Sequence, residues 1–447
     1  MKRDLRPQSD RVRARAGCIV PVSALLVTWL LLLPTRAQEI LVRDGHEEIT
    51  GGTMTVPFAF YNETVGFSTG ASIGNRGWIQ PQAAFFLTAV GSFDGTVYGF
   101  LALRDIEVFF SDRLFIDSQF NIGSFKQIDL YSDGNPDFPD QRAGSHDSSE
   151  DNFIAGDGSD NAAWARLEYI LPLGAGRDRP KSTLVLRDGI VVEGARETDP
   201  WNPVHSGFSI LSAKPFYRSQ EVDTKEAGER DTTTAGVEFS VRYENTDFRD
   251  NPSRGSVQQL RYSRDWGTMD SSAEWETVDL LCSKYFSLGE GITARQRVVA
   301  LNAWIIDAPS WDDFDIEESG KVYHRPPLYS GATLGGLNRL RGYQESRFHD
   351  RSAVYYTAEY RHIPEWNPLR GMSWLHKLNV YVDWMQFVGG VELGRVAAEF
   401  DLGELHSDMK ASLGLGLRAM VNHLIVRADV GISDEDVMVQ MTIDQPF

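Results

Sequence analysis

The chain has little of what marks several protein classes. Two cysteines among 447 residues are too few for a disulfide scaffold or a cysteine-rich metal centre. Basic residues are outnumbered, with 44 Lys and Arg against 63 Asp and Glu, and this acidity excludes a nucleic-acid binder that works by charge neutralisation. The chain is nevertheless 42% hydrophobic and 11% aromatic, which excludes a disordered protein.

Long hydrophobic runs are also scarce. The longest, Cys18–Leu33, is shorter than the ~20 residues that a helix needs to span a bilayer. It follows a basic segment and precedes Thr35-Arg36-Ala37, which offers small residues where a signal peptidase cuts. We expect residues 1–37 to be a cleaved signal peptide, with an uncleaved helical anchor as the alternative. The exported chain is then either soluble or a membrane β-barrel, whose strands need no long apolar run.

Apolar and polar residues alternate strictly near the C-terminus. From Val437 to Ile443 the odd-numbered positions are all apolar, and most of the positions between them are polar. The same period of two recurs in 424–431, 413–419, 378–384 and 354–361. A helix would instead repeat its apolar residues every three or four positions. The pattern therefore predicts that these five segments are strands with one face toward an apolar environment and the other toward water.

Weaker candidates lie upstream of a long segment, 308–352. Eleven strands are expected near 64–74, 81–92, 95–106, 112–125, 161–173, 181–192, 207–218, 233–244, 255–266, 272–287 and 292–307. Together with the five C-terminal strands they make about sixteen. The sequence predicts an all-β fold, a transmembrane antiparallel β-barrel over residues 63–447, preceded by a short periplasmic segment over 38–62.

The long segment carries a distinctive motif, Gly335-Gly336-Leu337-Asn338-Arg339-Leu340-Arg341-Gly342-Tyr343. A glycine-rich stretch with Leu-Arg-Gly-Tyr resembles the loop of the outer-membrane assembly-factor superfamily (BamA/TamA-like, also called the bacterial surface antigen family). The resemblance covers residues 330–447, and Asn62–Phe67 also resembles the start of the family's barrel. It implies that the long loop folds into the barrel lumen and that Arg341, Gly342 and Tyr343 lock it there.

The resemblance also implies which residues the loop arginine meets. Glu359 and Asp383 fall where the family has a wall glutamate and a wall aspartate, so we expect Arg341 to pair with both. Arginine suits this role because its planar fork can bridge two carboxylates. Both acids lie on the polar phase of their predicted strands, which should face the lumen. Three further residues on that phase are expected to form a lumen charge network: Arg418, Arg427 and Asp429.

The resemblance implies a function as well. Phe447 would be the terminal aromatic insertion signal of an outer-membrane barrel, and the family's first and last strands pair weakly and can open sideways. We expect an integral protein of the bacterial outer membrane that assists insertion or translocation of polypeptides. Its partners would be outer-membrane lipids, the barrel assembly machinery during its own insertion, and unfolded client proteins, with no nucleic acid and no cofactor.

The family's best-known members carry periplasmic POTRA modules; none is expected here, which leaves client recruitment open. A passive pore or structural barrel is the alternative.

An outer-membrane enzyme is the functional interpretation that the sequence favours least. Residues 66–70 and 70–74 fit the G-x-S-x-G pattern, but they lie in an alternating strand and not on a strand–turn–helix elbow, so Ser68 is not expected to be catalytic and nothing marks His349 as its base. The acidic stretches Asp133–Asp160 and Asp312–Glu318 could bind divalent cations. Neither has the spacing of a calcium loop, so we expect solvated charge and no metal site.

Overall fold

The computed structural model describes residues 39–43, 47–48, 53–62, 66–178, 180–225, 228–311, 324–377, 380–443 and 445–447. The expected signal peptide, 1–37, and the acidic stretch Asp312–Glu318 lie outside these described residues. Among the described residues, no helix combines the length and the hydropathy needed to cross a bilayer.

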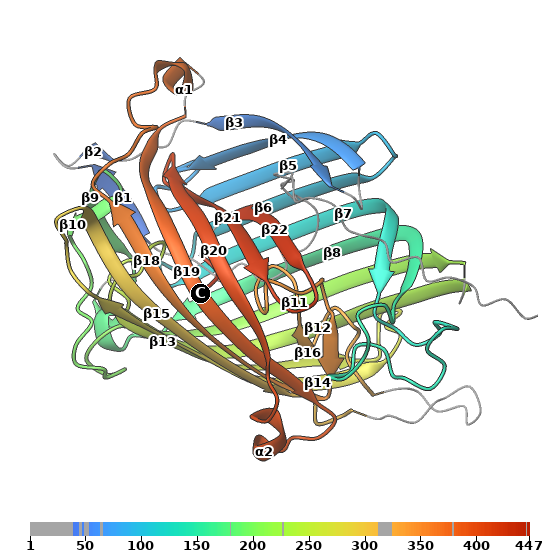
Figure 1. The fold of residues 1–447 in the computed structure, drawn as a ribbon. Helices are drawn as coiled ribbons and strands as arrows, with labels where there is room; N and C mark the ends of the chain where they lie inside the picture. The colour runs from blue at the N-terminus through green and yellow to red at the C-terminus, as the bar shows by residue number, and fades with distance from the viewer. Residues whose placement is uncertain are drawn as a thin grey trace, which may run out of the picture.

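One antiparallel sheet of sixteen strands forms the body of the molecule (Figure 1). Neighbours in sequence are neighbours in the sheet, apart from two long insertions between β8 and β11 and between β15 and β18. The strands, in chain order, are β3 (Met54–Asn62), β4 (Gly66–Arg76), β5 (Ala84–Ser92), β6 (Val97–Glu107), β7 (Leu114–Leu130), β8 (Ile154–Ile170), β11 (Phe208–Thr224), β12 (Gly228–Glu244), β13 (Gly255–Trp266), β14 (Glu274–Ser287), β15 (Ala294–Asp307), β18 (Ser352–Pro364), β19 (Val382–Ala397), β20 (Lys410–Val421), β21 (Leu424–Ile432) and β22 (Val437–Ile443). The predicted sixteen-stranded antiparallel barrel fold is confirmed.

The predicted membership of the sheet was wrong at one strand. Segment 181–192 is not in the wall, whereas residues 54–62, assigned to a periplasmic segment, form the first wall strand, β3. The barrel therefore begins at Met54 and not at residue 63. The error arose because 181–192 is apolar for a different reason, its packing inside the barrel.

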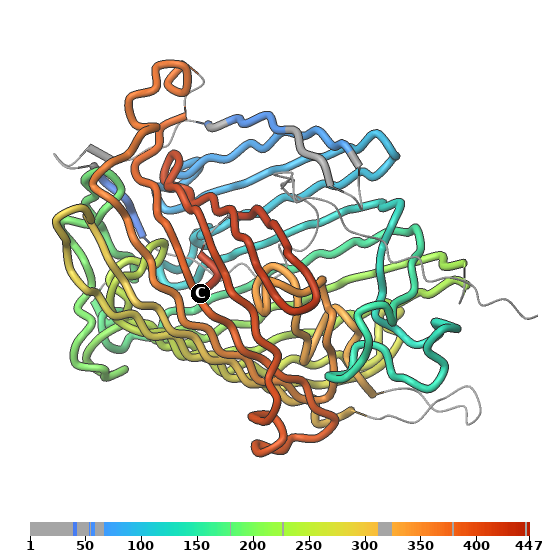
Figure 2. The backbone as a smooth tube through the Cα atoms, in the orientation of Figure 1, coloured from blue at the N-terminus to red at the C-terminus, as the bar shows by residue number. Residues whose placement is uncertain are grey.

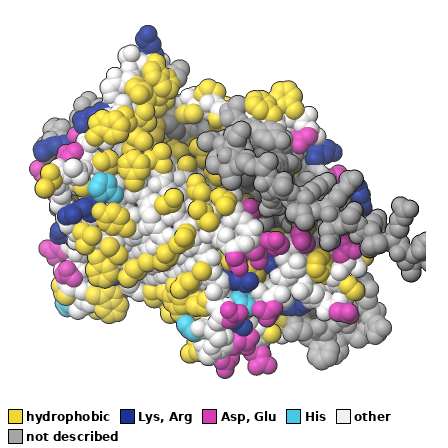
Figure 3. Space-filling model, in the orientation of Figure 1, with side chains coloured by type: hydrophobic (Ala, Val, Ile, Leu, Met, Phe, Trp, Pro, Cys, Tyr) yellow, Lys and Arg dark blue, Asp and Glu magenta, His cyan; other side chains and the backbone are white. Residues whose placement is uncertain are grey.

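Side chains alternate between the two faces of the wall. On β20, Leu413, Leu415 and Leu417 are 57%, 60% and 40% exposed, whereas Arg418 is fully buried. Figure 3 shows hydrophobic side chains spread over the outer surface of the strands. An apolar exterior around a polar interior is the arrangement that a lipid environment requires of a barrel.

Two short helices mark the ends of the barrel (Figure 1). Helix α1 (Ser373–Lys377) lies between β18 and β19, and α2 (Leu402–Leu405) lies between β19 and β20. We call these the α1 end and the α2 end. The long loops 131–153 and 308–351 both leave the wall at the α2 end, and the insertion 171–207, which includes the 3-10 helix η1 (Gly174–Arg177), leaves it at the α1 end.

A small sheet packs against the inner wall at the α1 end. Its strand order is β10-β9-β1-β2, from β10 (Ile190–Glu193), β9 (Ser182–Arg187), β1 (Glu39–Arg43) and β2 (Glu47–Glu48), with β1 parallel to β9. Leu41, Leu184 and Leu186 on its apolar face share a buried cluster with residues of the wall and of one loop. These are Phe248, which lies between β12 and β13, and the wall residues Ile363, Trp384, Met420 and Ile425. The interior at this end therefore combines an apolar cluster with buried ion pairs, such as those of Arg196 with Glu39 and Glu244, both at 2.9 Å.

The described part of the long loop, residues 324–351, folds back into the lumen (Figure 2). Its strands β16 (Ala332–Leu334) and β17 (Phe348–Asp350) pair with each other. Between them, Leu340 and Tyr343 are at most 1% exposed and share a core cluster with wall residues Trp304 and Tyr355. This cluster anchors the tip of the loop, and the fold confirms the expected lumen loop.

Candidate functional site

Glycines allow the tip of the lumen loop to lie directly on the wall. Gly335 and Gly336 have φ angles of 106° and 97°, a region that side chains rarely tolerate. A Cβ atom added to Gly431 of β21 would lie 2.2 Å from the carbonyl carbon and oxygen of Arg341, and one added to Gly342 would lie 2.7 Å from the backbone of Ile432. The motif's glycines and the wall glycine therefore permit backbone-to-backbone contact between loop and barrel.

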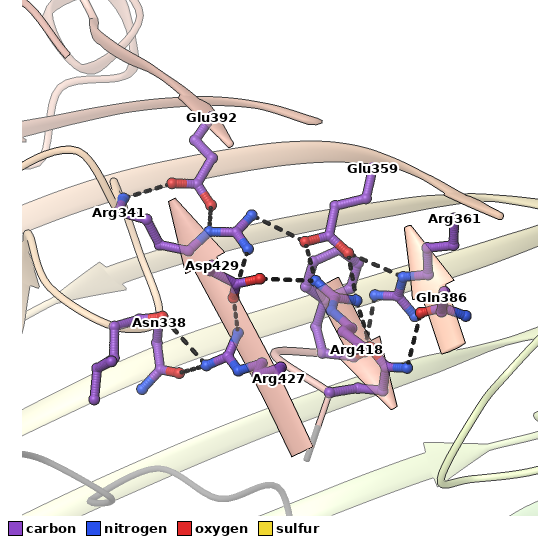
Figure 4. Close-up of polar contacts among 12 residues, drawn as sticks. Asn338, Arg341, Glu359, Arg361, Gln386, Glu392, Arg418, Arg427 and Asp429 are labelled. Atoms are coloured by element: carbon purple, nitrogen blue, oxygen red, sulfur yellow. Dashed lines mark hydrogen bonds and ion pairs between the residues drawn. The ribbon is translucent and has the colours of Figure 1, made fainter. Parts of the chain in front are cut away.

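Arg341 makes contact with three carboxylates at once (Figure 4). Its Nε donates to Glu392 at 2.7 Å, Nη1 to Asp429 at 3.1 Å and Nη2 to Glu359 at 2.9 Å. Its backbone N–H also donates to Glu392, at 2.6 Å. The side chains of all four residues are at most 3% exposed, so these are charge-assisted bonds shielded from water.

Three further guanidinium groups surround the same carboxylates. Arg418 and Arg361 contact Glu359 at 2.8 and 2.9 Å. Arg427 contacts Asp429 at 2.9 Å and donates to Asn338 of the loop at 3.2 Å. We call this group of four arginines and three acids the lumen cluster: Arg341, Arg361, Arg418, Arg427, Glu359, Glu392 and Asp429. Each acid accepts from more than one donor. The lumen cluster therefore links strands β18, β19, β20 and β21 to the loop.

The structure brings most of the predicted site residues together and corrects one. Arg341, Glu359, Arg418, Arg427 and Asp429 all lie in the lumen cluster, and their role as a lock stays a prediction. The pairing of Arg341 with Asp383 was wrong. Asp383 lies at the other end of β19, where it approaches His423 at 3.2 Å.

The reason for this error is a change of face at the start of β19. A register irregularity falls between Val382 and Trp384, and Trp384 turns inward, where its Nε1 donates to Gly189 of the small sheet at 2.9 Å. The apolar face that carries Trp384 was assumed to meet lipid, but it is internal at this end of β19. Asp383 therefore does not point into the lumen. The wall acid of β19 is Glu392, which sequence reasoning missed, although Val391-Glu392-Leu393 has the alternation of a wall strand. Arg361 was also missed, although it lies on the same predicted face as Glu359.

The loop tip is also bound to the turn between β21 and β22. The Tyr343 hydroxyl donates to Asp434 at 2.6 Å, and this bond lowers the pKa of the Asp434 carboxyl. Arg347 contacts Glu435 at 2.6 Å, and Ser433 donates to the carbonyl of Gly342 at 2.7 Å. The lumen loop therefore fixes the position of the last hairpin of the sheet.

Loop 131–153 covers the lumen loop from the α2 end. The backbone N–H of His349 donates to Gly144 at 2.8 Å, and its Nε2 lies 2.7 Å from the carbonyl of Tyr131. Burial lowers the pKa of the His349 imidazole to about 4. This histidine is thus a neutral structural donor. Ser68 lies within strand β4, where it pairs with Ser92 of β5, and not on a strand–turn–helix elbow.

The C-terminal residues enter the lumen. The Phe447 ring stacks on Tyr285 at a centroid distance of 6.4 Å, and the Arg361 guanidinium lies 4.8 Å from its centre. Gln445 is 3% exposed and contacts Gln386 at 3.3 Å. Phe447 is therefore an internal side chain in the folded barrel, and its role as an insertion signal stays a prediction.

The sheet has two unpaired edges. Its strand order begins at β3 and ends at β22, and among the described strands no pairing joins these two. A cavity of about 610 Å³ is lined by residues of both edges, including Val56 and Phe58 of β3 and Met438 and Met441 of β22. We call this region the seam. Its lining is largely apolar, in contrast to the lumen cluster.

Comparison with known proteins agrees with this architecture. A family model described as the Omp85 superfamily domain matches residues 202–443, more than half of the chain. No curated protein matches the chain.

Three solved structures are similar at low identity. They are BamA from Haemophilus ducreyi lacking POTRA domains 1–3 (13% identity, TM-score 0.45, covering 89% of this chain and 70% of that chain), CdiB from Acinetobacter baumannii (12%, 0.47, 88% and 59%) and CdiB from Escherichia coli (10%, 0.48, 88% and 61%). This chain thus spans about three fifths of the length of the two CdiB chains.

Proposed function

Because the chain belongs to the Omp85 superfamily, we propose that it assists the insertion of polypeptides into the bacterial outer membrane, or their translocation across it. The observation that carries this proposal is the seam. Strands β3 and β22 each present an edge that no described strand pairs with, next to an apolar cavity. Unpaired backbone N–H and C=O groups at a strand edge are a template for pairing with another chain.

In this proposal a client strand pairs with an edge of the seam. The apolar cavity receives its lipid-facing side chains, while the edge supplies backbone hydrogen bonds that lipid cannot supply. Clients, membrane lipids and the machinery that inserts this barrel are then its partners. The proposal places client binding at the seam and not at the lumen cluster.

The lumen cluster has a separate role in this proposal, as a lock. Arg341 holds the loop on β18, β19 and β21, and Tyr343 and Arg347 hold the turn that leads into β22. The loop thereby restrains the edge strand β22, so release of the lock would let this edge move. The lock also keeps the lumen filled, which favours this function over a passive pore.

The filled lumen supports the same preference at both ends. The small sheet packs inside the α1 end through the cluster that includes Leu184 and Trp384, and the lumen loop fills the α2 end beneath loop 131–153. A passive pore needs a continuous aqueous path, which these two segments obstruct.

A cross-link across the seam tests the proposal. In a Cys282→Ser background, cysteines at Val56 and Met441 would be joined by a bismaleimide, since both positions line the seam cavity. The barrel, reconstituted in liposomes, should speed the folding of a urea-denatured outer-membrane barrel, and the cross-link should abolish this effect.

The matched control joins two strands that already pair. Ala71 of β4 and Ala89 of β5 are register partners, so the same cross-link between cysteines there should leave the activity intact. Equal activity with a closed seam, or no acceleration by the unmodified barrel, would contradict the proposal.

A further inference from the structure

A buried histidine at the α2 end has no hydrogen-bonding partner among the described residues. His146 of loop 131–153 is 6% exposed, and neither its Nδ1 nor its Nε2 has a hydrogen-bond partner of normal geometry, although the backbone of Asp408 lies close to the imidazole. Buried polar groups in folded proteins are nearly always hydrogen-bonded or bound to an ordered water or ion, so two unsatisfied nitrogens on one imidazole are consistent with a ligand site.

Two carboxylates from different parts of the chain face this imidazole. The Nε2 atom lies 4.0 Å from Oδ1 of Asp147 and 3.8 Å from Oδ2 of Asp408. The three ligand atoms all lie within 4.8 Å of one another. These separations exceed hydrogen-bonding distance, yet they leave a space between one nitrogen and two oxygens.

We propose that His146, Asp147 and Asp408 bind a divalent transition-metal ion, with Zn²⁺ as the ion that best fits the donor set. One imidazole and two carboxylates supply three ligands, and water can complete a tetrahedron. Bonds of about 2.0–2.1 Å would bring the ligand atoms to about 3.3 Å apart. The two aspartate side chains are 85% and 87% exposed, so they are free to make this small movement.

The charge balance of the site also suits a cation. Two carboxylates offset the 2+ charge of the ion, although Arg395 and Lys410 lie near enough to oppose it. Arg395 is bound to the backbone beside the site, since its Nη1 donates to the carbonyls of Ser407 and Asp408 at 2.9 and 3.4 Å. Acidic side chains gather around the α2 end, as Figure 3 shows.

Metal binding here would link two loops that lie far apart in the sequence. Asp408 belongs to the connection between β19 and β20, while His146 and Asp147 belong to loop 131–153, which also holds Arg347 of the lumen loop through Ser148 at 2.8 Å. The ion would therefore fasten the cover of the lumen loop to the wall. Local spacing in the sequence could not predict the site, because its third ligand lies far away in the chain.

The test measures Zn²⁺ binding by the full barrel in detergent. Protein purified without a polyhistidine tag and stripped with EDTA is titrated with ZnCl₂ by calorimetry, and with Co²⁺ by its visible absorption. The wild type should bind one ion. His146→Ala should weaken binding by more than about 100-fold, beyond the 10–100-fold that loss of a second-shell partner costs.

Two further variants keep the result decisive. Asp147→Asn with Asp408→Asn changes only exposed side chains, so the barrel should fold as judged by circular dichroism and yet lose the ion. His376→Ala removes an exposed histidine at the α1 end and should bind as the wild type does. The proposal is overturned if the wild type binds no Zn²⁺, or if His146→Ala or the double variant binds it equally tightly.

Discussion

Replacement of Glu392 by glutamine separates the lumen cluster from ordinary wall charges. The substitution keeps the size of the side chain and removes the carboxylate that Arg341 contacts through both its Nε and its backbone N–H. Asp383→Asn is the matched control, because it makes the same chemical change on the same strand, β19, outside the cluster.

The structure sets the expected magnitudes. Glu392 is 1% exposed, and its loss leaves four buried guanidinium groups facing two acids. Removing one partner of a buried ion pair costs about 3–5 kcal/mol. The amide retains some hydrogen bonding, so we expect Glu392→Gln to lower the free energy of unfolding by about 2–4 kcal/mol. Asp383 is 22% exposed beside His423, and a pair of this kind contributes about 0–1 kcal/mol.

Urea unfolding in detergent, followed by tryptophan fluorescence, measures the difference. A shift in midpoint at constant slope reports a change in stability, whereas a change in slope reports a change in the exposed surface. Arg341→Lys should lose almost as much as Arg341→Ala, because the donors of an ammonium all lie on one atom and cannot span the three carboxylates that separate guanidinium nitrogens reach. Equal effects of Glu392→Gln and Asp383→Asn would refute the assignment of the cluster.

Three other perturbations follow from the same contacts. Gly431→Ala should destabilise the barrel by more than about 2 kcal/mol in urea unfolding, since its Cβ would lie 2.2 Å from the Arg341 backbone; a neutral result would show that the loop does not rest there. Tyr343→Phe removes the hydroxyl bonded to Asp434 and should cost about 1–3 kcal/mol, with faster tryptic cleavage of the lumen loop as the readout; unchanged cleavage would count against this contact. The pKa of His349 is held at about 4 in the folded state, so the unfolded state binds more protons below pH 6.5, and stability should fall by about 3 kcal/mol as the pH drops from 6.5 to 4. His349→Gln should flatten that part of the pH profile, and parallel profiles would contradict the assignment.

The sequence predicted the architecture well where a single physical rule applies. Strands β20 to β22 separate lipid from a polar lumen, so their alternation identifies both their type and their inward face, and Arg418, Arg427 and Asp429 were placed correctly. The contact between Arg341 and Glu359 was implied by the resemblance to the family and not by a periodic pattern, since the two residues lie on a loop and on a strand.

The errors occur where apolar side chains of the wall pack against a segment inside the barrel instead of facing lipid. At the α1 end the small sheet supplies an apolar partner inside the barrel, so Trp384 turns inward and the rule that apolar side chains face lipid fails. The same packing made segment 181–192 resemble a wall strand. Contacts between distant segments, such as Arg347 with Ser148 or His146 with Asp408, leave no periodic trace in a single sequence.

Ion conductance through single barrels in a planar bilayer tests the central claim most directly, because a lumen held closed by the Arg341 lock passes little current. The account predicts that the wild type stays mostly closed, that Arg341→Ala and Glu392→Gln show frequent opening, and that Asp383→Asn behaves as the wild type does. Steady conductance of the wild type, unchanged by Arg341→Ala, would contradict it.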